Sequence, residues 1–320
     1  MIRFLARRIG FALLVLWVVA TAVFLMYFVA PHNVARLIAG RQATAETVAL
    51  VRHRLGLDLP VPVQYGRFLL RLAHGDLGYS FVNSESIGAI IRRDLPVTAS
   101  LALGGAVLWL VIGVGAGVLA AKRPRSALDR VTTGLSLFFY SMPTFLLGEL
   151  FLLFLFFRLY MAGIRFFPPS GYVPLSASVG EWARHLILPW LTIALVTAAT
   201  YSRLVRGSML DVLGEDYIKT ARSKGLSERR VTYRHALRSA LTPALTQFGI
   251  DLGTLLGGAI VTEQVFGLPG LGREAVLAIT TEDLPLIIGI VILASAFVVV
   301  ANIVVDMLYA VLDPRVRVES

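Results

Sequence analysis

Histidine, acidic and hydroxyl side chains are the residues through which this sequence could bind a metal or catalyse a reaction, but their spacing predicts neither. The five histidines show no metal-ligand spacing, and no nucleophile lies in a recognisable Gly-x-Ser-x-Gly turn. The sequence has no cysteine, which excludes disulfides, thiolate catalysis and cysteine-ligated metals. We therefore expect a protein that is not an enzyme and holds no metal or cofactor. The histidines are His32, His53, His74, His185 and His235.

Nucleotide chemistry is not predicted for this chain either. No Gly-x-x-x-x-Gly-Lys-Ser/Thr motif occurs, so the backbone offers no phosphate cradle of that kind. If the protein does work driven by ATP, the ATP and its magnesium ion are bound by partner chains.

The most ordered group of charged side chains lies in residues 211–243, a polar stretch between two apolar segments. Its acids come at the start of a helical pattern and its bases near the end, as the helix dipole favours. Gly225 supplies a left-handed stop, and Ser227 can cap a second helix. We also expect an ion pair between Glu215 and Lys219, which are four residues apart. The seven bases are Lys219, Arg222, Lys224, Arg229, Arg230, Arg234 and Arg238, and the four acids are Asp211, Glu215, Asp216 and Glu228.

Two short amphipathic helices hinged at Gly225 are therefore predicted. Leu213, Ile218 and Ala221 form the apolar stripe of the first helix. A loop that only oriented the chain through its positive charge would need neither the glycine nor this stripe. We interpret the pair of helices as a docking surface for a partner protein; a solvated basic loop is the alternative.

Glu149, Arg203 and Asp251 are ionisable residues inside apolar segments, where a charge costs about 2.5–3.5 kcal/mol at the bilayer centre. Asp251 is two residues from both Gly249 and Gly253, so it points away from the face that these glycines form. We expect Asp251 to face a water-filled path or a partner such as Arg203. Glu149 presents the same choice between lining a path and pairing within the membrane.

The composition shows what must position these residues. Of the 320 residues, 57% are hydrophobic and 16% charged, and the mean hydropathy is +0.75, which is typical of a membrane protein. The net charge of +10 then reflects the placement of loops on a lipid bilayer and does not predict binding to nucleic acid. A membrane-spanning helix needs about 20 apolar residues. Six spans are predicted, at about 9–30, 97–121, 131–157, 185–206, 243–266 and 285–312.

The distribution of Lys and Arg predicts that both termini are cytoplasmic. Eighteen would then lie inside and twelve outside, and eight of the outer ones fall in a long segment that the positive-inside rule discounts. In that segment Thr44 caps a helix ending at Gly56, and residues 67–72 and 84–95 form two more short helical patterns. The predicted organisation is a first transmembrane helix (1–30), an extracytoplasmic helical segment (31–93), a transmembrane domain (94–312) with a cytoplasmic loop (207–242), and a cytoplasmic tail (313–320).

Small residues indicate how the spans pack. Gly113, Gly115 and Gly117 lie in the second span, and Gly249, Gly253 and Gly257 follow one another at four-residue spacing in the fifth. Glycines four residues apart let helix backbones approach closely in lipid, so we expect Gly113, Gly117, Gly249, Gly253 and Gly257 to form packing ridges. Pro143 interrupts the third span, where we expect a kink.

Motifs along nearly the whole chain add a resemblance to these predictions. DYIKTARSKG at 216–225 resembles the cytoplasmic "EAA" loop of bacterial ATP-binding-cassette importer permeases, specifically the dipeptide/oligopeptide/nickel permease family. The resemblance extends to RLGLDLPVPVQY at 54–65, GDLG at 75–78, LPVTASL at 95–101, HLILPWLTIAL at 185–195, VFGLPGLGRE at 265–274 and LYAVLDPRVR at 308–317.

The resemblance implies a type I importer permease fold in the bacterial cytoplasmic (inner) membrane. It implies a pairing with a second permease, docking of two ATPase subunits that bind ATP and magnesium, and delivery of a peptide by an extracytoplasmic binding protein. Lys219, Thr220, Ala221 and Gly225 match the Glu-Ala-Ala and Gly positions of the loop, with Lys219 in place of the acid. The residues expected to couple to the ATPase are Glu215, Asp216, Tyr217, Lys219, Thr220, Ala221, Arg222, Lys224 and Gly225.

Two other functions stay open. Related permeases carry nickel or other small solutes, so the cargo could differ within the same family. A channel or secondary transporter would need no ATPase and would show inverted repeats, but residues 1–160 and 161–320 show no convincing repeat.

Overall fold

The computed structural model describes residues 2–26, 34–39, 43–54, 56–256 and 259–312, and these residues are mostly helical. Five helical segments in this part of the chain are long and apolar enough to cross a membrane. They lie in α1 (Ile2–Phe24), α5 (Ile87–Lys122), α9 (Val179–Leu213), α16 (Leu284–Leu312) and a helix formed by α7 (Thr144–Phe151), a π-helical stretch (Leu152–Arg158) and α8 (Leu159–Met161). The all-α membrane fold predicted from the sequence is confirmed.

Two of the six predicted spans are interrupted. The expected kink at Pro143 is a full break, because α6 (Ala127–Ser141) ends before the proline and α7 begins after it. The predicted span 243–266 is divided between α13 (Thr242–Leu256) and α14 (Ile260–Val265), and Gly257 lies outside the described residues. The count of six spans and the cytoplasmic location of both termini stay predictions.

The interface between α5 and α9 is the largest between two helices and forms the centre of the main core. A Cβ atom on Gly113 would lie 2.6 Å from the Cβ of Tyr201, and one on Gly117 would lie 2.8 Å from the carbonyl oxygen of Ser202. Glycine therefore lets the two backbones touch at these positions. At Gly115, by contrast, an added Cβ would meet nothing within 4 Å.

A second glycine contact joins α13 to α16. A Cβ atom on Gly249 would lie 2.5 Å from Val305, and one on Gly253 would lie 2.9 Å from the Cα of Val298. The four-residue spacing thus places both glycines against the same neighbour. This contact fixes the rotation of α13 and with it the direction in which Asp251 points.

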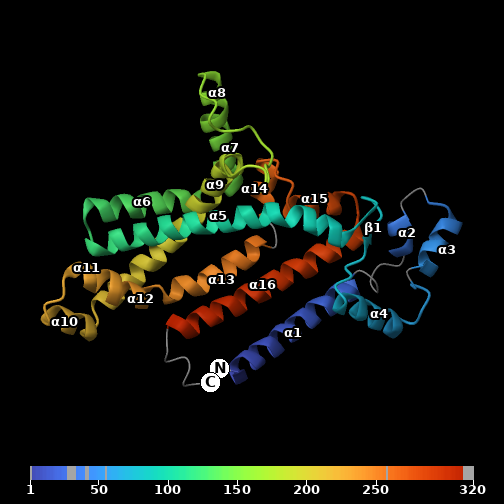
Figure 1. The fold of residues 1–320 in the computed structure, drawn as a ribbon, viewed down its shortest axis with the longest axis horizontal. Helices are drawn as coiled ribbons and strands as arrows, with labels where there is room; N and C mark the ends of the chain where they lie inside the picture. Colours follow the sequence, from blue (N-terminus) through green and yellow to red (C-terminus); the bar gives the residue numbers. More distant parts are fainter. Residues whose placement is uncertain (1, 27–33, 40–42, 55, 257–258, 313–320) are drawn as a thin grey trace.

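The short elements gather at two opposite ends of the long helices (Figure 1). At one end lie α10 (Asp216–Ser223), α11 (Glu228–Arg230), a π-helical stretch (Val231–Ala236) and α12 (Leu237–Ala240). The opposite end carries α2 (Val34–Ala39), α3 (Ala45–Arg54), α4 (Val61–Ala73), α15 (Leu271–Thr280) and an antiparallel hairpin of β1 (Tyr79–Ser80) and β2 (Glu85–Ser86).

The segment after the first span follows the sequence prediction in part. Thr44 caps α3, since its Oγ1 accepts from the N–H of Thr47 at 3.2 Å, and Gly56 adopts the left-handed φ of +66°. The helical pattern at 67–72 belongs to the longer α4. The helical pattern at 84–95 is confirmed from Ile87 onward, but it is not a separate short helix. It forms the start of α5, which continues through Pro96 and buries Ile87, Ile90 and Ile91.

Candidate functional site

α10 is an amphipathic helix that lies on the core with its apolar side inward. Ile218 and Ala221 are buried in the main core, whereas Tyr217 is 46% exposed and donates to Ser239 of α12 at 3.2 Å. The side chains of Asp216 and Lys219 are 95% and 64% exposed. A charged, accessible face is the result, and Glu215, Thr220, Arg222 and Lys224 add to it.

The turn after α10 is closed by hydrogen bonds of the backbone and of the side chains. Gly225 has a φ of +74°, its N–H donates to the carbonyl of Arg222 at 2.9 Å, and the N–H of Leu226 donates to that of Ala221 at 3.4 Å. The guanidinium of Arg222 then donates to Glu228 of α11 at 2.8 and 3.4 Å. The predicted left-handed stop is confirmed, and the exposed Arg222–Glu228 pair bridges it.

Two local contacts differ from the sequence prediction. Lys219 pairs with Asp216 at 2.8 Å, one turn back at i, i+3, and not with Glu215. The reason is that Glu215 is the N-cap residue, with an extended backbone, and therefore precedes the first helical turn. Ser227 occupies the N-cap position of α11 but its side chain accepts no capping hydrogen bond.

An ion pair that sequence reasoning missed holds α9 where it leads into α10. Arg206 donates through Nε and Nη2 to the two carboxylate oxygens of Asp129 at 2.6 and 2.9 Å. Asp129 also accepts from the N–H of Arg125, and these donors hold its pKa at about 2. The sequence signal that could have identified Asp129 is its position three residues after Ser126, which caps α6.

The ionisable residues of the apolar segments do not form one cluster. Asp251 accepts from Tyr201 of α9 and from Gln247, both at 2.9 Å. Arg203, the partner suggested by the sequence, instead stacks on the ring of Tyr140 at 4.3 Å and is exposed. Glu149 is exposed and forms neither a hydrogen bond nor an ion pair within the described ranges. The geometry thus gives Asp251 an internal partner and leaves Glu149 facing outward.

Metal-binding geometry is absent from the part of the chain that the structure describes. Three or more His, Cys, Asp or Glu side chains do not converge there. His53 pairs with Asp58 at 2.9 Å, and His74 and His185 contact backbone carbonyls. His32 lies outside the described residues. The three histidines with these contacts therefore serve local structure.

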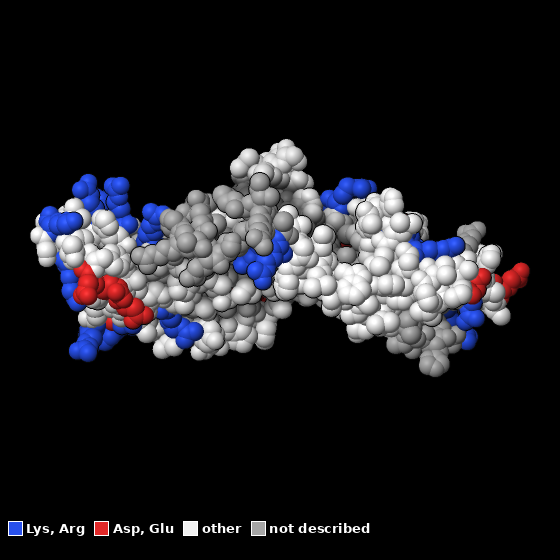
Figure 2. All heavy atoms as spheres, turned by 90° about the horizontal axis from the view of Figure 1, so that it is seen from below, with Lys and Arg blue, Asp and Glu red and all other residues white. Residues whose placement is uncertain are grey.

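Charged side chains are most numerous at one end of the surface. Figure 2 shows Lys and Arg gathered around the end that carries α10, with smaller groups near the middle and at the opposite end. Large apolar side chains such as Val111, Phe138 and Phe154 are more than half exposed along the middle. This arrangement matches a chain whose middle lies in lipid or against another apolar surface.

Comparisons with known protein families cover almost the whole sequence. Residues 113–318 match the family described as binding-protein-dependent transport system inner membrane component. Residues 1–102 match the N-terminal part of binding-protein-dependent transport system membrane components.

Individual relatives align over nearly their full lengths. A putative peptide transport system permease protein of Brucella abortus is 42% identical over 311 residues, which are 97% of this chain and 98% of the relative. The glutathione transport system permease protein GsiC of Salmonella paratyphi A is 36% identical over 317 residues, with 99% of each chain covered. Among solved structures, a chain of the inward-facing MetNI methionine ABC transporter aligns with a TM-score of 0.56 at 18% identity, covering 70% of this chain and 96% of that one.

Proposed function

The chain belongs to the family of binding-protein-dependent transport system inner membrane components, and we propose that it carries peptides across a bacterial cytoplasmic membrane. It is a multi-pass permease subunit of an ATP-binding-cassette importer and not an enzyme, because in this family separate ATPase subunits hydrolyse ATP. Peptide is the cargo in the name of the Brucella relative, which matches nearly the whole chain.

The observation that carries the proposal is the geometry of α10. Its apolar face is buried against the core while its charged face is accessible, and the turn at Gly225 is fixed by the backbone and by the Arg222–Glu228 pair. A helix held in this way can be displaced by a partner and can transmit the displacement to α9 without changing its own conformation. We therefore assign α10 as the helix that docks on the ATPase.

The proposed assembly combines permease, ATPase and binding-protein subunits. This permease pairs with a second permease through apolar faces, two ATPases bind ATP and magnesium beneath them, and an extracytoplasmic binding protein delivers the peptide to the path. ATP binding draws the ATPases together, their motion tilts α10, and α9 and α5 carry the tilt to the path.

Charge reversal in α10 and disruption of the turn after it test this assignment. Lys219→Glu and Gly225→Pro should leave peptide capture by the binding protein unchanged while uptake by the assembled transporter is lost and ATP hydrolysis continues. Lys219→Glu also breaks the pair with Asp216. The variant Asp216→Lys/Lys219→Glu restores that pair with its charges exchanged. Because docking depends on the charges that α10 presents to the ATPase and not on the pair itself, this double variant should stay uncoupled. Normal uptake in the double variant would contradict docking through this face.

A second cargo is favoured by one specific comparison. The similarity to GsiC makes glutathione, itself a small peptide, a candidate substrate. Competition separates the two, because unlabelled glutathione should abolish uptake of a labelled tripeptide only if both use the same transporter. Nickel uptake would assign the chain to the metal-carrying members instead, and transport by the purified chain without any ATPase would indicate a secondary transporter or channel.

A further inference from the structure

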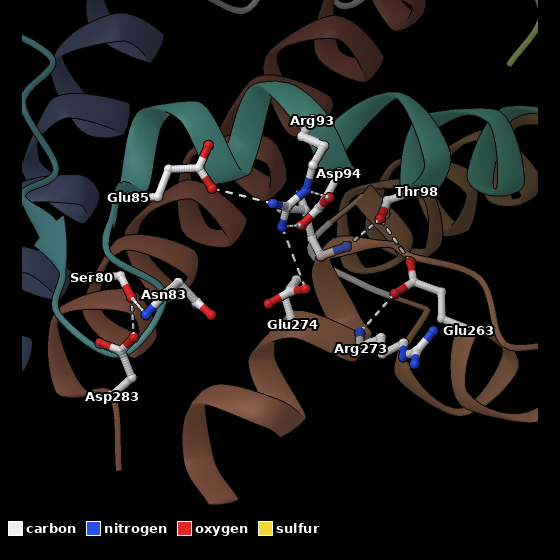
Figure 3. Close-up of polar contacts among 11 residues, drawn as sticks. Ser80, Asn83, Glu85, Arg93, Asp94, Thr98, Glu263, Arg273, Glu274 and Asp283 are labelled. Carbon is white, nitrogen blue, oxygen red and sulfur yellow. Dashed lines mark hydrogen bonds and ion pairs between the residues drawn. The ribbon is translucent and has the colours of Figure 1, made fainter. Parts of the chain in front are cut away.

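We propose that Glu263 is a positioning residue that fixes α15 to α5, so that both helices move as one unit at the end of the molecule opposite α10. The effect on transport rests on the proposed function, whereas the contact itself can be measured without it. Figure 3 shows the polar contacts that join residues 80–98 to residues 263–283.

Glu263 bridges three elements. Its carboxylate is fully buried and accepts from Thr98 of α5 through Oε1 at 2.7 Å, and from the N–H of Arg273 in α15 through Oε2 at 2.9 Å. Thr98 Oγ1 in turn accepts from the N–H of Leu271 at 2.9 Å. The first turn of α15 is therefore capped by side chains of α14 and α5, and its dipole favours the carboxylate.

Glycines close the space around this carboxylate. A Cβ atom on Gly270 would lie 2.4 Å from Cδ of Glu263, and one on Gly272 would lie 2.8 Å from the Cα of Ile260. Gly270 has a φ of −108°, which any residue adopts, so glycine is required here for space alone. The carboxylate is enclosed by its own chain, which leaves no room for a substrate and makes a positioning role the consistent one.

Two further groups of polar contacts lie at the same end of the molecule. Arg93 of α5 donates to the buried Asp94 at 2.7 and 3.0 Å, and it also reaches Glu85 at 3.2 Å and Glu274 of α15 at 3.6 Å. Ser80 of β1 donates to Asp283, which precedes α16, and both are buried. Asp94, Ser80 and Asp283 are buried and paired, whereas the Arg93 side chain is 55% exposed. These contacts join α5 to α15 and β1 to the residue before α16, so this end should move as a body.

The long helices connect this end to α10. α5 has 36 residues and packs along α9, whose last turn leads into α10. At about 1.5 Å per residue, α5 extends roughly 54 Å, far enough to join both ends of the molecule. A displacement of α10 should therefore reach α15 through α5, provided that Glu263 holds the two helices together.

Spin labels can test the contact because the chain has no cysteine of its own. Cysteines replacing Val107 of α5 and Ile279 of α15, which are 61% and 63% exposed, would carry the labels in the transporter assembled with its ATPases and binding protein. We expect a single narrow distance distribution that is unchanged by ATP trapping. Glu263→Ala should remove the narrow peak and reduce peptide uptake by about 2- to 30-fold, the range typical of coupling residues.

Gly270→Ala provides the more specific variant. Its methyl group would strike Glu263, so it should remove the narrow peak in the natural background and change nothing further when it is combined with Glu263→Ala. Gly115→Ala, whose methyl group meets nothing within 4 Å, is the matched control and should leave the distribution narrow.

The outcomes separate this inference from the proposed function. A narrow peak retained in Glu263→Ala, or a Gly270→Ala effect that persists when Glu263→Ala is already present, would overturn it, even in a transporter that imports peptide normally. If Glu263→Ala does not fold, Glu263→Gln keeps the shape but has one acceptor oxygen in place of two, so it cannot accept from both Thr98 and Arg273. A peak as narrow as that of the natural chain in this variant would also overturn the inference. A transporter with a narrow, Glu263-dependent peak that imports no peptide would contradict only the function.

Discussion

Arg206 of α9 and Asp129 of α6 form a bidentate ion pair, with Nε and Nη2 of the arginine 2.6 and 2.9 Å from the two carboxylate oxygens. Their positions are 77 residues apart in the sequence, and the pair joins the start of α6 to the last turns of α9. α10 begins directly after α9 and a two-residue turn. The pair therefore fixes the base from which the proposed coupling helix extends.

Replacing this arginine should weaken coupling more than it weakens folding. Arg206→Lys keeps the charge but cannot reproduce the two parallel hydrogen bonds. We expect uptake per ATP hydrolysed to fall by about 2- to 30-fold in reconstituted vesicles. Arg130→Lys is the control, since Arg130 is exposed beside Asp129 on α6; an equal loss in both variants would exclude a specific role for the pair.

The pH dependence of stability should reveal the same pair. Because the folded pKa of Asp129 is about 2, below its ordinary value of 3.8, the ionised carboxylate stabilises the fold above pH 4 and loses this effect as the pH falls towards 2. The difference in melting temperature between the natural chain and Asp129→Asn should thus be constant from pH 5 to 8 and shrink from about pH 4 to 2. A difference that varies between pH 6 and 8 would assign the titration to another group.

Glycine substitutions in α5 should differ sharply by position. Gly113→Ala places a methyl group 2.6 Å from Tyr201 and should destabilise the fold by about 1–3 kcal/mol. Gly115→Ala enters open space and should be neutral or stabilise the helix by up to about 1 kcal/mol. Thermal unfolding of the detergent-solubilised chain measures both, and equal effects would refute close packing of α5 on α9.

The pair of Asp251 and Tyr201 predicts an ordered series of variants. Asp251→Ala leaves the Tyr201 hydroxyl and the Gln247 amide without this acceptor, which costs about 1–3 kcal/mol. Asp251→Asn keeps one acceptor oxygen and should lose less in thermal unfolding. If the asparagine variant were fully stable yet inactive in uptake, Asp251 would instead serve the transport path.

The parts of the site that depend on local sequence could be predicted. α10 is specified within one short stretch by its acids, its bases, Gly225 and the stripe of Ile218 and Ala221, so no knowledge of the tertiary structure was needed. Leu213, predicted in the same stripe, is instead the last residue of α9. Pro143, where a kink was expected and a full break is found, and the packing glycines are local signals of the same kind.

Contacts between distant segments could not be predicted in this way. Whether Asp251 meets Tyr201 or Arg203 depends on the rotation of α9, which its contact with Gly113 and Gly117 sets. Glu263 lies in the predicted span 243–266 but was not among the candidate residues, and its partners Thr98 and Arg273 follow only from the fold. The charge at Asp251 could be noticed in the sequence, and its partner could not.

Cross-linking from α10 tests the central claim most directly. A photoreactive amino acid at Thr220, which is exposed on α10, should form an adduct with an ATPase subunit in cells. The same amino acid at Val82, 53% exposed at the opposite end, should form no such adduct. An ATPase adduct from Val82 and none from Thr220 would contradict the account.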